Sequence, residues 1–169
     1  MKTKITLITA AVALLAAVSI TAAVAGPSKG SQPSVGVSKS AFGRILVDRR
    51  GHSLYRFAMD KGRMSTCYGA CAAAWPPLIS SVKPHVRAGA KRSLLGRTRR
   101  IGGRWQVTYN GHPLYTFVKD TAKGQTNGEG VNAFGAEWDL VSPGGATIVN
   151  GTPSSGTGSS PGGYGGYGP

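Results

Sequence analysis

The stretches GHSLYRFAMD (Gly51 to Asp60) and GHPLYTFVKD (Gly111 to Asp120) are two copies of one phrase, sixty residues apart and identical at six of ten positions. The same offset relates Gly43-Arg44 to Gly103-Arg104 upstream. Self-similarity at a fixed period is typical of units that cannot bury their own apolar side chains and must pack against a neighbouring copy. The repeat therefore predicts two equivalent structural units in contact with each other.

Each copy contains a turn, at Arg50-Gly51 or Asn110-Gly111, between two runs of alternating apolar residues. Asn-Gly in this setting is a strong signal for a β-hairpin with a two-residue loop. Such a loop predicts these cross-strand pairs in the two copies: Arg49–His52, Val47–Leu54 and Arg44–Phe57, and Tyr109–His112, Val107–Leu114 and Arg104–Phe117. The Arg–Phe pairs would place a guanidinium on an aromatic ring.

This register leaves both faces of each hairpin partly apolar, and a lone hairpin is marginal in water. We therefore predict a mainly β fold, in which two tandem β-hairpin repeats pack into one small domain with one or two short helical turns. The repeated motif residues, which we expect to be structurally equivalent in pairs, are Tyr55, Phe57 and Asp60 and Tyr115, Phe117 and Asp120. Each Asp ends its strand, where a carboxylate typically caps the following turn.

YRFAMD (Tyr55 to Asp60) and YTFVKD (Tyr115 to Asp120) resemble the Yx(FWY)xxD motif of a family of bacterial secreted repeats and predicted lipoproteins. CYGACAAAWPPL (Cys67 to Leu78) and WQVTYNGHPLY (Trp105 to Tyr115) resemble the same family, and the likeness extends over about residues 42–143. The resemblance implies an exported or cell-envelope protein and no established activity. Two departures are the lack of a lipoprotein Cys and the neutral-to-basic sequence before Trp105, where the family often has an acidic residue.

The two cysteines, Cys67 and Cys71, are the only ones in the chain. An exported protein meets oxidising conditions, so we predict a disulfide between them. Ala70 to Trp75 reads as a short helical turn that Pro76-Pro77 ends, and Gly69 permits the distortion that a bridge across four residues requires. The disulfide would therefore pin one loop rather than the whole fold.

A metal or thiol-redox site is the alternative interpretation of this pair. Two thiolates with His52 and His112 have the ligand types that copper or zinc prefers. The spacing is Cys-x-x-x-Cys rather than a zinc spacing, and the histidines are scattered. No cofactor is therefore expected on the first interpretation, and copper or zinc on the alternative.

The ends of the chain differ in composition from its middle. Lys2 and Lys4 precede an apolar run, and Ala23-Val24-Ala25 fits a cleavage site, so residues 1–25 are predicted to be a signal peptide whose removal leaves no membrane span. Residues 26–38 are expected to be flexible, and residues 142–169, rich in Gly, Ser, Pro and Tyr, to be disordered. The two-repeat β domain would occupy residues 39–141, with repeats at about 42–80 and 102–141.

Positive charge is concentrated between the repeats. The chain has 20 Lys and Arg against 6 Asp and Glu, a net charge of +14. The candidate polyanion-binding residues in this acid-free segment are Lys83, Arg87, Lys91, Arg92, Arg97, Arg99 and Arg100. Because burying unpaired charge is costly, we expect all of them to face solvent. No aromatic residue is interleaved in residues 83–100, so specific nucleic-acid binding is not indicated.

No catalytic motif for nucleophilic, phosphate-loop or metalloprotease chemistry occurs in the sequence. The sequence therefore predicts a secreted, non-enzymatic protein associated with the cell envelope. Its expected partners are anionic envelope polymers or lipid head groups, bound non-specifically. The alternative function is a periplasmic or extracellular metal-binding or thiol-redox protein that uses Cys67 and Cys71.

Overall fold

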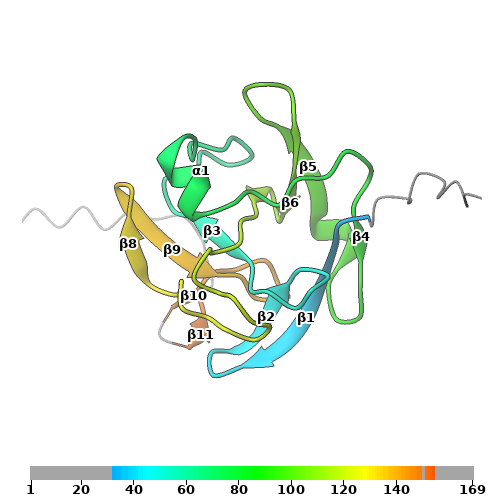
Figure 1. Cartoon of the computed structure of the whole chain (residues 1–169). Coiled ribbons are helices and arrows are strands. Elements are labelled where there is room, and N and C mark those ends of the chain that lie inside the picture. The colour runs from blue at the N-terminus through cyan, green and yellow to red at the C-terminus, as the bar shows by residue number, and fades with distance from the viewer. Residues whose placement is uncertain (1–31, 150, 155–169) are drawn as a thin grey trace, which may run out of the picture. The chain divides into compact units, whose positions relative to one another are not determined.

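The computed structural model describes residues 32–149 and 151–154. The predicted signal peptide and the end of the predicted tail lie outside these residues. The fold is mainly β, as predicted, with one short helix (Figure 1). Its elements are β1 (Ser34–Ser40), β2 (Gly43–Val47), β3 (Tyr55–Phe57), α1 (Ala70–Ala74), β4 (His85–Val86), a 3-10 turn (Arg92–Leu94), β5 (Leu95–Arg99), β6 (Trp105–Tyr109), β7 (His112–Pro113), β8 (Val131–Ala133), β9 (Ala136–Leu140), β10 (Ile148–Val149) and β11 (Thr152–Pro153).

Two of the expected boundaries were wrong. β1 begins at Ser34, inside the segment expected to be flexible, because its backbone pairs with β2 over five positions. β10 and β11 lie inside the segment expected to be disordered, where Ile148 packs into the core. The part of residues 142–169 that the structure describes is therefore an ordered extension of the second repeat.

The strands form small sheets with the orders β2-β1-β4, β5-β6-β7, β3-β9-β8 and β10-β11. All pairings are antiparallel except β1 with β4. A cluster of buried apolar residues lies between the β1–β2 and β5–β6 hairpins: Val35, Leu46, Leu54, Val107, Tyr109, Leu114 and Val141. No helix in the described part of the chain is long and apolar enough to cross a membrane.

The turn of the second repeat has the predicted register. Tyr109 pairs with His112, and Asn110 and Gly111 between them have φ angles of 48° and 78°. Two consecutive left-handed residues make the type I′ turn that Asn-Gly favours. The amide of Leu114 donates to the carbonyl of Val107 at 3.0 Å, which continues the same register.

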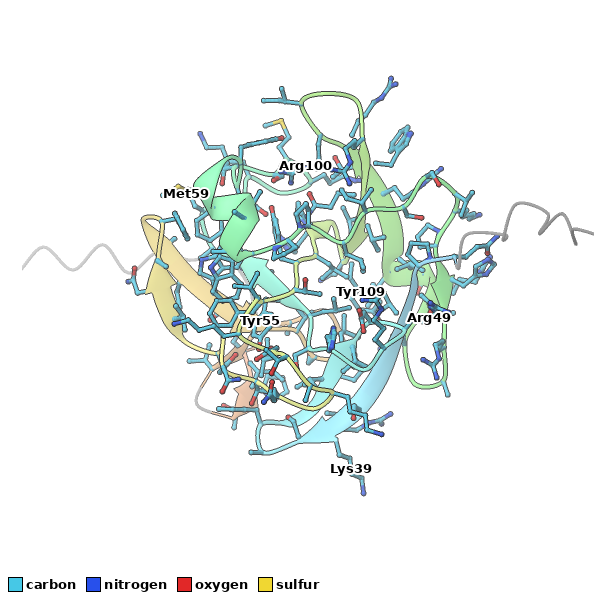
Figure 2. The ribbon with its side chains drawn as sticks, in the orientation of Figure 1. Lys39, Arg49, Tyr55, Met59, Arg100 and Tyr109 are labelled. Carbon is cyan, nitrogen blue, oxygen red and sulfur yellow. A yellow bond between two sulfur atoms is a disulfide. The ribbon has the colours of Figure 1, made fainter. Side chains whose placement is uncertain are left out.

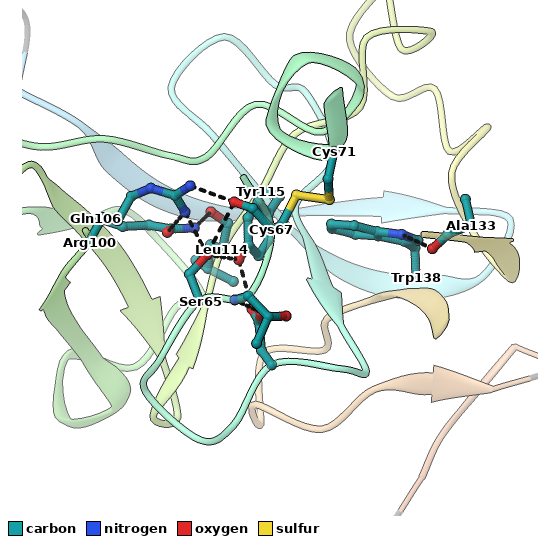
Figure 3. Close-up of a disulfide and its surroundings, with 11 residues drawn as sticks. Ser65, Cys67, Cys71, Arg100, Gln106, Leu114, Tyr115, Ala133 and Trp138 are labelled. Carbon is teal, nitrogen blue, oxygen red and sulfur yellow. Dashed lines mark hydrogen bonds between the residues drawn. A yellow bond between two sulfur atoms is a disulfide. The ribbon is translucent and has the colours of Figure 1, made fainter. Parts of the chain in front are cut away.

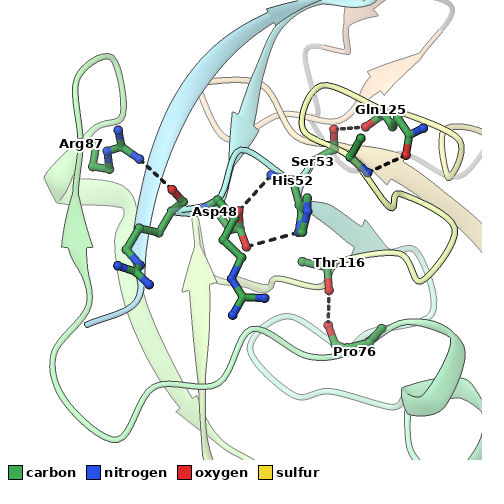
Figure 4. Close-up of polar contacts among 10 residues, drawn as sticks. Asp48, His52, Ser53, Pro76, Arg87, Thr116 and Gln125 are labelled. Carbon is green, nitrogen blue, oxygen red and sulfur yellow. Dashed lines mark hydrogen bonds and ion pairs between the residues drawn. The ribbon is translucent and has the colours of Figure 1, made fainter. Parts of the chain in front are cut away.

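The predicted register of the first repeat was wrong by one residue. Val47 bridges Ser53 rather than Leu54, so the loop holds three residues, Arg49 to Gly51. The carboxylate of Asp48 accepts hydrogen bonds from the amides of Arg50 (2.8 Å) and His52 (2.9 Å), and these bonds stabilise the longer turn (Figure 4). Gly51 takes the left-handed conformation, at φ 88°, that closes such a loop.

The predicted Arg–Phe pairs were also wrong. After each turn the chain leaves its own hairpin, and Tyr55 pairs with Tyr115 through two backbone hydrogen bonds of 2.9 and 3.0 Å. Phe57 and Phe117 are consequently buried in the core, whereas Arg44 and Arg104 are exposed. The second strand of each hairpin thus joins the two repeats instead of completing its own sheet.

The motif residues make reciprocal hydrogen bonds across this junction. The hydroxyl of Tyr55 donates to Asp120 Oδ2 at 2.6 Å, and that of Tyr115 donates to Asp60 Oδ2 at 2.8 Å. Burial raises the pKa of both tyrosines, and the neighbouring carboxylates raise it further. Each repeat therefore supplies the tyrosine donor to the other repeat's acceptor.

Each aspartate also binds its own loop, as its position at the end of a strand predicted. Asp60 Oδ1 accepts from the amide of Thr66 at 2.7 Å, and Asp120 Oδ1 accepts from the amide of Asn127 at 2.9 Å. One carboxylate thus caps a loop and receives the partner repeat's tyrosine at the same time.

Four aromatic rings stack at the centre of the molecule. Trp75 and Trp138 lie parallel with centroids 4.0 Å apart, Phe117 stacks on Trp75 at 4.0 Å, and Phe57 stacks on Trp138 at 4.2 Å. Each Phe packs on the Trp of the other repeat, so the stack has the same reciprocity as the Tyr–Asp hydrogen bonds. Both Trp side chains are fully buried, and Figure 2 shows Tyr55 inside this core.

We predict that Tyr55→Phe and Tyr115→Phe will each lower the free energy of unfolding by about 1–3 kcal/mol. Each change removes the hydroxyl that donates to a carboxylate, while the phenyl ring of the variant occupies the same space as the tyrosine ring. Thermal or denaturant unfolding of the purified protein measures the effect. Tyr68→Phe is the control, because that hydroxyl bonds at the surface, and it should cost about 0.5 kcal/mol or less. Unchanged unfolding in both core variants would contradict the prediction.

Candidate functional site

Four basic side chains from three segments of the chain line one cavity of about 580 Å³. Arg49 and Arg50 come from the turn after β2, Arg87 follows β4, and Lys123 comes from the loop of the second repeat. We call this cavity the basic groove. Its floor is formed by residues 36–38 of β1 and by Val47, and all four of its basic residues are exposed.

Backbone contacts hold the groove together. Arg87 Nη1 donates to the carbonyl of Arg49 at 3.2 Å (Figure 4), and the stem of Arg87 lies over Gly36, whose missing side chain leaves the space. The amide of Gly124 donates to the carbonyl of Gly51 at 3.1 Å, which brings Lys123 against the turn of the first repeat. The groove therefore forms only when both repeats are in place.

The acidic residue in the groove is already engaged. Asp48 bonds to two backbone amides of its own turn, and its Oδ2 lies 3.8 Å from His52 Nδ1. Throughout the described residues, no Lys or Arg lies within ion-pair distance of a carboxylate. The basic side chains of the groove are thus available to an external anion.

The predicted basic segment is divided among several surroundings. Lys83, Arg92 and Arg97 line a second cavity of about 430 Å³, which shares no lining residue with the basic groove. Lys91 and Arg99 are exposed outside both cavities, and Arg99 lies over the ring of Trp105. The sequence run is therefore not one continuous binding patch.

Arg100 was wrongly expected to face solvent. It is only 8% exposed, because its guanidinium donates to Gln106 Oε1 (2.6 Å), Ser65 Oγ (2.6 Å) and the carbonyl of Cys67 (2.5 Å) (Figure 3). It also lies 4.3 Å from the centroid of the Tyr68 ring. Three acceptors and an aromatic face replace the lost hydration, so this arginine is structural.

Sequence reasoning missed Arg49, Arg50 and Lys123. The first two belong to the repeated turn and the third to the loop after Asp120, more than seventy residues away. No spacing pattern links them, because the contact between Gly51 and Gly124 that joins them is made by backbone atoms. The motif residues Tyr55, Phe57, Asp60, Tyr115, Phe117 and Asp120, by contrast, lie in or against the core and serve the fold.

Cys67 and Cys71 form a disulfide, with Cα atoms 5.3 Å apart, at the start of α1 (Figure 3). Gly69 lies between them at φ 54°, the left-handed conformation that the distorted turn requires. Neither cysteine presents a thiolate in this state. No three or more His, Cys, Asp or Glu side chains are grouped to hold a metal ion within residues 32–149 and 151–154.

The histidines of the alternative metal site have other surroundings. His52 faces Asp48, whereas His112 begins β7 beside Arg56. Burial and the charge of Arg56 lower the pKa of His112. The structure therefore places the two histidines in the turns of different repeats, as their positions in the repeated phrase require.

Most acidic side chains are engaged inside the molecule. Glu129 Oε2 accepts from the amide of Leu140 at 2.6 Å, and burial raises the pKa of this carboxyl to about 7. Asp139 is 7% exposed, and burial together with the charge of Glu137 raises its pKa to about 6. Glu137 is the one exposed carboxylate in the described residues, whereas 14 of the 17 Lys and Arg there are exposed.

Replacing the buried Arg100 should destabilise the folded protein, whereas replacing the exposed Arg99 should have little effect on its stability. We predict that Arg100→Gln lowers the free energy of unfolding by about 2–3 kcal/mol, since hydrogen bonds to a charged group are lost. Arg99→Gln is the matched control and should change it by less than about 0.5 kcal/mol. Denaturant unfolding of both variants measures the difference, and equal stabilities would contradict it.

The raised carboxyl pKa values predict a pH-dependent stability. Glu129 and Asp139 bind protons more tightly in the folded state than in the unfolded one, so their contribution is present at low pH. It is lost as pH rises from about 4 through about 7. His112, with its lowered pKa, opposes this trend below about 6.5.

Glu129→Gln should therefore flatten the fall in melting temperature between about pH 5 and about pH 8. The variant and the wild type should melt alike at the acidic end, since Gln resembles a protonated Glu. Identical pH profiles of the two proteins would show that Glu129 titrates normally.

A family model matches the chain over residues 36–79 and 97–142, together more than half of its length. The two matched segments coincide with the two structural repeats. The first begins within β1 and the second within β5, two strands that lie before the predicted starts of the repeats at about residues 42 and 102. Searches of curated proteins and of solved structures found no match. The family is described as a secreted repeat of unknown function, which agrees with the resemblance carried by the Tyr and Asp motif. The chain therefore belongs to this family of secreted repeats, is exported, and contains two copies of the repeat.

Proposed function

We propose that the protein is a non-enzymatic, cell-envelope-associated protein that binds anionic envelope polymer in the basic groove. The observation that carries this proposal is the convergence of Arg49, Arg50, Arg87 and Lys123 on one cavity without a carboxylate partner. Like charges brought together repel one another, and an anion in the groove would relieve that repulsion. Membership of a secreted family supports an extracytoplasmic ligand.

The chemistry of the groove favours phosphate or carboxylate groups. Arginine presents a planar fork of donors that matches either group, and three of the four basic residues are arginines. The cavity volume falls within the range of small-molecule sites, so one segment of a longer polymer can enter. Val37 and Val47 add an apolar floor that suits the carbon skeleton of a sugar or polyol unit.

The surface charge supports the same conclusion. Because five of the six carboxylates are engaged or partly buried and the basic residues are mostly exposed, the outer surface is more positive than the composition alone indicates. Such a field would draw polyanions to the groove, and the attraction would weaken with added salt.

The triple variant Arg49→Gln, Arg50→Gln and Lys123→Gln should lose most of the affinity for inorganic polyphosphate, the test polymer. It should also reduce the slope of log affinity against log salt by about 2, since each neutralised phosphate of a single chain contributes roughly 0.7. Titration of the secreted chain at several salt concentrations measures both quantities.

The matched control is Lys39→Gln, Lys61→Gln and Lys119→Gln. These residues are also exposed, and the change in net charge is identical. If the control weakens binding as much as the groove variant, attraction is a property of net charge and the groove is not the site.

A further inference from the structure

The end of the β5–β6 hairpin is a tight, ordered turn. The amide of Arg100 donates to the carbonyl of Arg104 at 2.9 Å, and that of Gly103 donates to the carbonyl of Arg100 at 2.9 Å. Gly102 and Gly103 supply the left-handed conformations, at φ 86° and 83°. Figure 1 shows this turn extending away from the other strands.

The turn is anchored at its base. Arg100 is fixed by the three acceptors described above, one of which is the carbonyl of the disulfide-bonded Cys67. The amide of Ile101 donates to the hydroxyl of Tyr68 at 3.2 Å. The disulfide, the buried arginine and the tyrosine together hold the Ile101 backbone in one position.

Large apolar side chains are nevertheless left in water at this end. Ile101 is 84% exposed, Met64 63% and Trp105 37%. Met64 lies beside the hairpin on the face opposite to Trp105, because its neighbour Ser65 accepts from Arg100, whose guanidinium also bonds to Gln106 on that face. Ile101 and Trp105 lie in the same turn, and apolar groups exposed together inside a polar rim mark interaction surfaces.

Basic side chains surround these apolar ones. The guanidiniums of Arg97 and Arg99 lie 4.9 and 5.6 Å from the centroid of the Trp105 ring, and Arg104, next to Trp105 in the turn, is exposed. The sequence contains no Asp or Glu between Asp60 and Asp120. The carboxylate nearest to its base, that of Asp60, is already bonded to Tyr115 and Thr66. The hairpin end therefore combines aliphatic, indole and guanidinium groups with no acid on its own strands.

We propose that this hairpin end docks on a surface of anionic lipid head groups. Ile101 at the tip would enter the boundary of the hydrocarbon, Trp105 on one face of the hairpin and Met64 on the other would lie at head-group depth, and the arginines would contact phosphate. The inference rests on the proposed binding of anionic envelope material and names lipid as the material at this second surface. A soluble polyanion satisfies the arginines but offers nothing to Ile101 or Met64, so the exposed apolar groups favour lipid.

The secreted chain contains its own reporter for this contact. Of its three Trp residues, Trp75 and Trp138 are 1% and 0% exposed, so only Trp105 can change environment at the surface. Vesicles of phosphatidylglycerol and phosphatidylcholine in equal parts should shift the Trp emission to the blue and protect it from acrylamide at low salt. Phosphatidylcholine vesicles should do neither, and Trp105→Phe should abolish the shift.

Substitutions separate the apolar from the electrostatic contribution. Ile101→Ser should lower the vesicle partition coefficient about tenfold, and Arg99→Gln or Arg104→Gln about fivefold each. Val149→Ser, at an exposed valine of β10, is the matched control and should leave partitioning unchanged. Circular dichroism and melting should be unaffected, because all four side chains are exposed.

The same proteins titrated with polyphosphate distinguish this inference from the groove. Ile101→Ser should leave polyphosphate binding intact, and the groove triple variant should retain the blue shift. The inference is overturned if anionic vesicles produce no shift, or if Ile101→Ser partitions like the wild type. It is equally overturned if Ile101→Ser weakens polyphosphate and vesicle binding alike. The first two results would leave polymer binding in the groove unaffected, because that proposal is tested by the groove triple variant and its lysine control. The third would mean that polyphosphate also binds at the hairpin end, since Ile101 does not line the groove.

Discussion

Two hydrogen bonds that cross between the repeats, from Tyr55 to Asp120 and from Tyr115 to Asp60, constrain the placement of the functional surfaces. Each aspartate is also bonded to its own loop, so the crossing bonds position the two long loops as well as the core. The loop after Asp60 leads to Cys67 and thereby to the acceptors of Arg100, and the loop after Asp120 carries Lys123 to the groove. Surface chemistry in this protein is therefore set by polar contacts made in its interior.

The parts of the fold that depend on local geometry could be predicted from the sequence. Asn110-Gly111 requires consecutive left-handed residues, and that requirement determined the register of the second turn. The register of the first turn was not predicted correctly, because hydrogen bonds to the carboxylate of Asp48 stabilise a loop that is one residue longer. The exchange of partners could not be predicted, since a repeated motif shows that two copies make equivalent contacts and not whether each makes them within itself or with the other.

The candidate site was less predictable than the fold. The run of basic residues was visible, but the strand that carries part of it directs Arg97 and Arg99 to Trp105 and buries Arg100 beyond its end. Arg49, Arg50 and Lys123 meet only because backbone atoms of Gly51 and Gly124 are bonded. Net charge follows from composition. The distribution of charge over the surface depends on which carboxylates are hydrogen-bonded inside the molecule, and here most of them are.

The reciprocal stack of Phe117, Trp75, Trp138 and Phe57 has a consequence for the stability of the chain. A polypeptide with one repeat would have to associate with a second copy to cover its rings, and its stability would depend on its concentration. Joining the copies in tandem makes that association intramolecular and independent of dilution. In a tandem chain the two copies need not have the same sequence. Here one copy contains the disulfide at Cys67, and the other contains the acidic strand around Asp139. The tandem arrangement therefore gives one molecule two halves that share a core but differ at their surfaces.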